Sequence, residues 1–200
     1  MRQLALGISP PPEPSLDNFV PGENVELLVR LRELKAGTLA ERIVYLWGEP
    51  GCGRSHLLRA CDGPGVTVAD DVDLLDEARQ SGLFSRINEA REAGTAVLAA
   101  GNAPPAQLAA REDLRSRLAW GLVYQIKPLT DAERAVYLAA EAERRGMRLA
   151  DDVVWYLLAR VRRDLTSLGG ILELLDRTSL EQKRRITLPL VRETLKTPGE

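Results

Sequence analysis

A glycine-rich stretch, GEPGCGRS at residues 48–55, has the spacing of a phosphate-binding loop. It matches the pattern G-x-x-x-x-G-K-[ST] at Gly48, Gly53 and Ser55, and departs from it only at Arg54, which replaces the lysine. Between a strand and a helix, such a loop directs backbone N–H groups at an anion, and the helix dipole adds positive charge. The stretch predicts a nucleotide site, against the alternative of a Gly/Pro-rich turn that binds nothing.

Arg54 is expected to change what this loop can do. A lysine reaches the β- and γ-phosphates as a compact charge, whereas an arginine is larger, planar and forked, so the exchange is not conservative at a tight site. We expect nucleotide binding to persist and positioned hydrolysis to be impaired. An efficient intrinsic ATPase is therefore not predicted.

Further polar residues could complete the site. Ser55 stands where a Mg²⁺ ligand is needed, and Asp70, at the end of the next apolar run, stands where a metal-binding carboxylate belongs. Asn102 follows another apolar run and could orient a γ-phosphate or a water, although an Asn before two prolines is also a common turn residue. Taken alone, Arg117 and Arg163 are more often surface charges than catalytic groups.

Alternating strands and helices would position these residues. Apolar runs typical of buried parallel strands occupy residues 42–47, 66–70, 95–102 and 122–129. Segments of helical character lie between or before them, at residues 24–37, 55–62, 83–94 and 104–121. From Leu129 onward the apolar residues keep a helical period, with Thr130, Asp151 and Thr187 as expected N-caps.

This pattern predicts three regions. Residues 15–128 are expected to form an α/β domain with a parallel sheet, and residues 129–200 a small all-helical domain. Residues 1–14 contain SPPPEP, which fits neither a helix nor a central strand, so this region is expected to be a tail or linker.

The composition narrows the class of protein. Two hundred residues, 44% of them apolar, can form a real core. No stretch approaches the roughly 18 apolar residues of a membrane span, and the first residues are too short an apolar run for a secretory signal, so a cytosolic protein is expected. Two cysteines and one histidine cannot build a disulfide framework or a zinc site. A net charge of −2 argues against a protein that mainly grips nucleic acid.

In this order, the segments resemble the AAA+ ATPases related to the bacterial replication initiator DnaA. The resemblance is carried by LDNFVPGEN, YLWGEPGCGRSHLLRA, VADDVD, GNAPPAQL, SRLAWG and RRDL…LLDRTSL, and covers essentially the whole chain. The closer resemblance is to the Hda subfamily, the regulatory inactivators of DnaA, which also has arginine in GRSHLL. The resemblance implies a P-loop AAA+ core with a trimmed parallel sheet, followed by a helical lid, in the bacterial cytoplasm.

The resemblance also implies a cofactor, ADP or ATP with Mg²⁺, and roles for single residues. Ser55 and Asp70 would hold the metal, with Asp70 as the Walker B acid. Arg117, in the SRL box, would reach across an interface into a neighbour's nucleotide site and act there in trans. The implied nucleotide-binding residues are Phe19, Val20 and Asn24 near the adenine, Gly48, Gly51, Cys52, Gly53, Arg54, Ser55 and His56 at the loop, Asp70, Asn102 as sensor 1 and Arg163 as sensor 2.

An N-terminal peptide is implied to bind the DNA polymerase sliding clamp. Family members carry a segment like QL-x-L-x-L that docks in a hydrophobic cleft of the clamp, and QLALGI here supplies Gln3, Leu4, Leu6 and Ile8. A short extended peptide on a proline-rich linker suits this role. Gly7 stands where the family usually has proline, and a frayed terminus is the alternative.

Three departures from the family pattern shape the expected function. About fifteen residues separate Ser55 from Asp70, where relatives have room for another helix and strand, so the sheet is expected to lack one element. Asp71 takes the place of the acid that orients the attacking water, and together with Arg54 disfavours intrinsic hydrolysis. No helix-turn-helix segment follows the lid helices, and an initiator would need such an element to read its origin.

We therefore expect a negative regulator of replication initiation. It would hold ADP, dock on the DNA-loaded clamp, and present Arg117 to ATP-bound DnaA to promote hydrolysis there. DNA would be reached only through the clamp, no membrane is involved, and self-association is left open. The alternatives are a self-contained P-loop ATPase that acts as a loader or adaptor for another replication protein, and a scaffold with an empty pocket.

Overall fold

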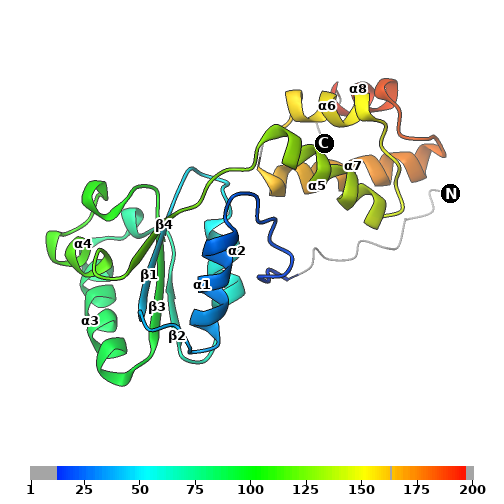
Figure 1. Cartoon of the computed structure of the whole chain (residues 1–200). Helices are drawn as coiled ribbons and strands as arrows, with labels where there is room; N and C mark the ends of the chain where they lie inside the picture. The colour runs from blue at the N-terminus through cyan, green and yellow to red at the C-terminus, as the bar shows by residue number, and fades with distance from the viewer. Residues whose placement is uncertain (1–12, 163, 197–200) are drawn as a thin grey trace. The chain divides into compact units, whose positions relative to one another are not determined.

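The computed structural model describes residues 13–162 and 164–196, which form two compact units (Figure 1). An α/β unit ends at Pro128 and a helical unit begins at Leu129. The residues predicted to bind the clamp, and Arg163, lie outside the described residues. In the described part of the chain, no helix has both the length and the apolar character needed to cross a membrane.

The α/β unit is built on a four-stranded parallel sheet. Its strands lie in the order β2-β3-β1-β4, and their bounds are Ile43–Trp47 for β1, Val66–Ala69 for β2, Ala96–Gly101 for β3 and Leu122–Gln125 for β4. Val44 of β1 pairs with Leu98 of β3 on one side and with Leu122 of β4 on the other. The predicted parallel α/β core is thus confirmed.

Helices cover both faces of this sheet (Figure 1). α1 (Val25–Lys35) and α2 (Arg54–Cys61) lie on one face, and α3 (Glu77–Ala93) and α4 (Glu112–Leu118) lie on the other. Within β1, Val44 and Leu46 belong to the core with α1 and α2, whereas Tyr45 belongs to the core with α3 and α4. A strand buried on both faces has no polar positions, which is why β1 is an unbroken apolar run in the sequence.

Between α2 and β2 the chain has only a short turn, at the place where the sequence predicted a missing helix and strand. After α2 ends at Cys61, the turn at residues 62–65 leads directly into β2, an edge strand of the sheet. Two short 3-10 helices complete the unit, η1 (Val72–Leu74) after β2 and η2 (Pro105–Gln107) after β3. The carboxyl ends of β1, β2 and β3 consequently face the same edge of the sheet.

The second unit consists of α5 (Asp131–Arg144), α6 (Asp151–Arg160), α7 (Leu165–Gln182) and α8 (Leu188–Lys196) around an apolar core. Thr130 caps α5 as predicted, because its side chain accepts a hydrogen bond from the N–H of Glu133, whose carboxylate accepts from the N–H of Thr130. The predicted N-cap at Asp151 is wrong by one residue. Ala150 is the N-cap, and Asp151 lies in the first turn, where its charge still favours the helix dipole.

Candidate functional site

The loop at residues 48–55 joins the end of β1 to the first turn of α2. Gly51 and Gly53 have φ of 82° and 104°, in the left-handed region that favours glycine. Gly48 is buried, and a Cβ there would lie 2.8 Å from Cys52 Sγ and 3.0 Å from the carbonyl oxygen of Ile126. The glycines are therefore needed for a loop that folds tightly on itself.

Two features of this loop favour an anion. In the described chain, Leu57 donates its N–H to Gly53 O, whereas the N–H groups of Ser55 and His56 have no backbone acceptor. Such free N–H groups at a helix start are donors for a phosphate. Burial raises the pKa of the Cys52 thiol, which keeps the loop free of a thiolate charge at neutral pH.

Arg54 lies inward rather than in solvent. Its side chain is only 12% exposed, and its Nη2 lies 3.5 Å from Asp71 Oδ1. Its Nη1 is buried without a hydrogen-bond partner among the described residues. A buried polar group without a partner is unusual and costly, and a phosphate oxygen is the acceptor that a guanidinium prefers. The loop therefore fits a phosphate group.

The Arg54–Asp71 contact was not predicted from the sequence. Asp71 has φ of 44° although it is not a glycine, which marks a strained backbone next to the site. This conformation places the Asp71 carboxylate against the loop's own arginine. Asp71 is thus engaged in an ion pair with the arginine of the loop.

A line of polar groups lies at the carboxyl ends of the strands. Asp70 Oδ1 accepts the N–H of Asp71 at 2.9 Å, and Asp73 Oδ1 accepts the N–H of Asn102 at 2.9 Å. Tyr45 donates its hydroxyl to the carbonyl oxygen of Ala103, and burial raises the pKa of this hydroxyl, helped by the charge of Asp73. Asp73 was recognisable from the sequence as one of three acids after the second apolar run, but it received no role there, and Tyr45 was not singled out.

The predicted metal ligands are not joined by a direct contact. No hydrogen bond links Ser55 to Asp70 in the described part of the chain, where no group of three or more His, Cys, Asp or Glu residues could hold a metal. Mg²⁺ usually keeps several waters and takes substrate phosphates as ligands beside one or two carboxylates. The residues present fit that mode of binding and not an all-protein cage.

An N-terminal segment lies against the loop. The ring of Phe19 lies so close to Gly53 that a Cβ there would be 2.6 Å from Phe19 Cε2. The Phe19 ring also lies 5.5 Å from the ring of His56, between centroids, and His56 Nε2 is hydrogen bonded to the carbonyl oxygen of Ser15. Three of the predicted nucleotide-binding residues are thus brought together, with Val20 half-buried beside them.

Asn24 fixes this segment to the end of the sheet. It is 4% exposed, and its amide group donates to the carbonyl oxygens of Pro21 and Lys127 and accepts the N–H of Lys127. The amide is fully engaged within the chain. Asn24 therefore holds the segment that carries Phe19 and Val20, and any contact with an adenine would be indirect.

Replacing Asn24 by alanine should lower the free energy of unfolding by about 1–3 kcal/mol, because the hydrogen bonds of this buried amide with the backbone of Lys127 and Pro21 would be lost. Urea denaturation measures this change. Asn102→Ala is the matched control, since the Asn102 side chain is exposed and its expected effect is within about 0.5 kcal/mol. Equal midpoints for Asn24→Ala and the parent chain would contradict the role given to Asn24.

Arg117 lies in the last turn of α4 and contacts aromatic rings. Its Cζ is 3.9 Å from the centroid of the Trp120 ring and 5.3 Å from that of Phe84. Among the described residues no carboxylate forms an ion pair with it. Leu114 and Leu118 of the same helix are fully buried, which fixes α4 against the sheet.

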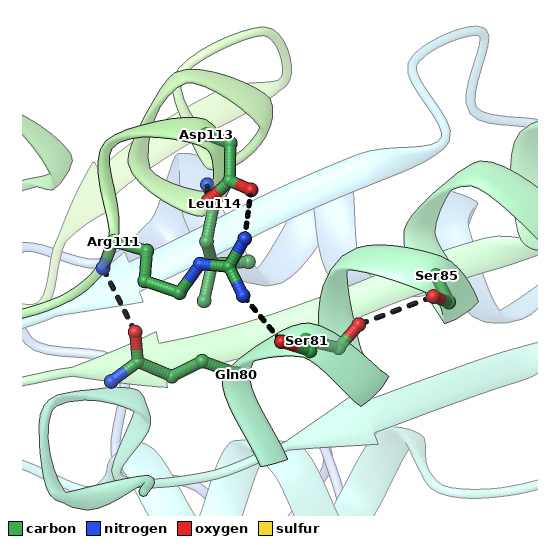
Figure 2. A network of polar contacts seen from close by, with 6 residues as sticks. All are labelled: Gln80, Ser81, Ser85, Arg111, Asp113 and Leu114. Carbon is green, nitrogen blue, oxygen red and sulfur yellow. Dashed lines mark hydrogen bonds and ion pairs between the residues drawn. The ribbon is translucent and has the colours of Figure 1, made fainter. Parts of the chain in front are cut away.

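A polar network ties the start of α4 to the start of α3 (Figure 2). Arg111 donates its N–H to Gln80 Oε1 at 2.8 Å, and its guanidinium binds the Ser81 hydroxyl and Asp113 Oδ2. Asp113 Oδ1 in turn accepts the N–H of Leu114. The network holds α4 in place relative to α3, and with it the position of Arg117.

Comparisons with known proteins agree with this architecture. The helical unit matches the family model described as "Hda, lid domain" over residues 131–195. The whole chain is similar in structure to domain III of the Thermotoga maritima replication initiation protein DnaA, with a TM-score of 0.76 and 20% identity over 93% of this chain and 97% of that one.

Two further solved structures show the same likeness. AMPPCP-bound DnaA from Aquifex aeolicus gives a TM-score of 0.70 and 21% identity over 83% of this chain and 66% of that one. The Thermotoga maritima RuvB Holliday junction branch migration motor gives a TM-score of 0.71 and 19% identity, over 92% of this chain and 72% of that one. At such identities these likenesses establish the fold alone, and they confirm the predicted AAA+-like arrangement of a parallel α/β core followed by a helical unit. The lid match confirms the predicted resemblance to Hda for residues 131–195.

Proposed function

We propose that this chain is a regulator of the Hda type that ends replication initiation by promoting hydrolysis of ATP bound to DnaA. The match of residues 131–195 to the Hda lid model carries this proposal. The similarity to nearly the whole of DnaA domain III supports it, because an arginine of one protein can act in trans on a nucleotide held by another. DNA would be reached only through the sliding clamp.

Arg117 would act on the nucleotide of the partner. When water attacks the γ-phosphorus of ATP and the bond to the β-phosphate oxygen breaks, negative charge is redistributed over the oxygens of the transferred group. A guanidinium supplied in trans stabilises that charge. Arg117 suits this role because its guanidinium lies on aromatic rings and forms no ion pair with a carboxylate among the described residues, so its positive charge is not neutralised.

The chain's own loop would bind ADP or ATP as a structural or switching ligand. The N–H groups of Ser55 and His56 and the free Nη1 of Arg54 would receive the phosphates. Mg²⁺, where bound, would neutralise part of the phosphate charge, with Ser55 and Asp70 as its protein-side partners. The ion pair of Arg54 with Asp71 would keep hydrolysis in this site weak.

The test is the rate of hydrolysis of ATP preloaded on DnaA, with and without this chain and a DNA-loaded clamp. Acceleration only when all components are present supports the proposal. No acceleration, with the chain bound to the clamp, overturns it and indicates an adaptor for another client. Turnover by the chain alone that is lost in Asp70→Asn would instead favour the self-contained ATPase.

The N-terminal peptide provides a separate prediction about the clamp. The double change Gln3→Ala and Leu4→Ala should weaken clamp binding at least about thirtyfold, because the loss of even one anchor residue at such a cleft costs about 2 kcal/mol or more. Surface plasmon resonance on immobilised clamp measures the affinity. Ser9→Ala, outside the motif, is the control, and unchanged affinity of the double variant would show that the peptide does not bind.

A further inference from the structure

Trp120 is an exposed aromatic residue next to Arg117. Its side chain is 55% exposed, although a tryptophan contributes large apolar area. It comes just after Ala119, the C-cap of α4, and residues three apart on a helical turn share one face, so the indole and the guanidinium meet. The separation of 3.9 Å between Arg117 Cζ and the ring centroid is that of a close cation–π contact, and a guanidinium reaches such a distance most readily by lying on the ring face.

Arg117 differs in this respect from the other arginines of the same segment. Arg111 pairs with Asp113, and Arg115 pairs with Glu112. Arg117 alone of the three lies on rings, those of Trp120 and Phe84, without a paired carboxylate in the described chain. Its positive charge is held in place but not neutralised.

The geometry of a stacked guanidinium leaves its donors free. Stacking uses the flat face of the group, whereas its five N–H donors point outward in its plane. A carboxylate partner would occupy two of those donors and cancel the charge. A phosphate that approaches the edge of a stacked Arg117 therefore meets an oriented donor set without displacing a competing anion.

The backbone of Trp120 is held in a fixed place. The N–H of Trp120 donates to the carbonyl oxygen of Arg117. Gly121, the next residue, packs so closely on the backbone of Ile43 at the start of β1 that a side chain there would overlap the Ile43 carbonyl oxygen. The backbone from which the indole projects is thus anchored between α4 and the sheet.

We propose that Trp120 is a positioning residue that holds Arg117 by its face, in the orientation from which its N–H edge reaches the phosphates of a partner's nucleotide. This inference rests on the proposed function of Arg117. It implies that loss of the indole lowers the rate of the stimulated step at saturation, because a small misplacement of a catalytic group lowers a rate strongly. Loss of the indole should have a smaller effect on the concentration of this chain that gives half-maximal stimulation.

The test compares Trp120→Leu with Trp120→Phe in the DnaA hydrolysis assay, over a range of concentrations of this chain. Trp120→Leu should lower the maximal rate roughly 10- to 100-fold. Trp120→Phe, which keeps a π face, should retain it within about threefold. Trp155→Leu is the matched control, since Trp155 is also half-exposed, at 52%, but lies in the helical unit. It should leave the maximal rate unchanged.

A second readout uses the isolated chain. Protons of the Arg117 side chain above an indole ring should show an upfield ring-current shift in NMR spectra, and most of the shift should be lost in Trp120→Leu, where only the more distant Phe84 ring remains. A full maximal rate in Trp120→Leu, or a change confined to the half-stimulating concentration, would overturn the positioning role. If the shift is present but the parent chain does not stimulate hydrolysis, the proposed function itself is overturned, and the role of the stack with it.

Discussion

Arg117→Ala should abolish the stimulation of DnaA-bound ATP hydrolysis while the chain stays folded and still binds the clamp. An arginine supplied in trans contributes roughly 10³- to 10⁵-fold to such rates, so even partial dependence on this residue would be easy to detect. The fold should tolerate the change, because Arg117 is partly exposed and, among the described residues, its guanidinium forms no ion pair but lies on the rings of Trp120 and Phe84. Single-turnover hydrolysis of labelled ATP preloaded on DnaA measures the effect.

Arg91→Ala separates directed catalysis from general attraction. The Arg91 guanidinium also lies by the Trp120 ring, with its Cζ 5.5 Å from the centroid, so this variant removes a like charge from the same surface. It should reduce stimulation only a few-fold, roughly as a surface charge alters association. Stimulation that survives in Arg117→Ala, or falls equally in both variants, would contradict the assignment of Arg117.

Much of the fold could be predicted from the sequence, for a physical reason. Strands buried on both faces must be apolar throughout, so β1 and β3 were recognisable as unbroken runs before the helical period began. Helix starts depend on a short local signal, and Thr130 with Glu133 supplied one. The N-cap predicted at Asp151 was wrong by one residue, because an acid is favourable both at the N-cap and in the first turn of a helix.

Contacts between distant segments could not be predicted. The amide of Asn24 binds the backbone of Lys127, and a local reading of the sequence cannot show that a polar side chain pairs with a segment so far along the chain. The Arg54–Asp71 ion pair depends on the left-handed backbone of Asp71, which residue type does not reveal. The contact between Arg117 and Trp120 could have been predicted from their three-residue spacing. The contact with the second ring, Phe84, could not, because Phe84 comes from another helix.

Gly53→Ala should eliminate nucleotide binding, whereas Gly65→Ala should preserve it. Both glycines have positive φ, 104° and 83°, so both alanine variants carry a similar backbone penalty of about 1–2 kcal/mol. Only Gly53 is crowded, because its new Cβ would lie 2.6 Å from Phe19 Cε2, whereas a Cβ at Gly65 has nothing within 4 Å. Either the loop or the Phe19 ring must move, and both belong to the proposed pocket.

Unfolding in urea with and without ADP measures this difference. Saturation at 100 times the dissociation constant should stabilise the parent chain by ~2.7 kcal/mol. Gly65→Ala should be less stable than the parent chain without ADP but should still be stabilised by ADP to the same extent. Gly53→Ala should not be stabilised by ADP. A gain retained in Gly53→Ala would contradict the assignment of the loop, and no gain in the parent chain would indicate an empty scaffold. Phe19→Ala added to Gly53→Ala removes the obstructing ring, so partial recovery of the gain would show that crowding, and not backbone strain, had closed the site.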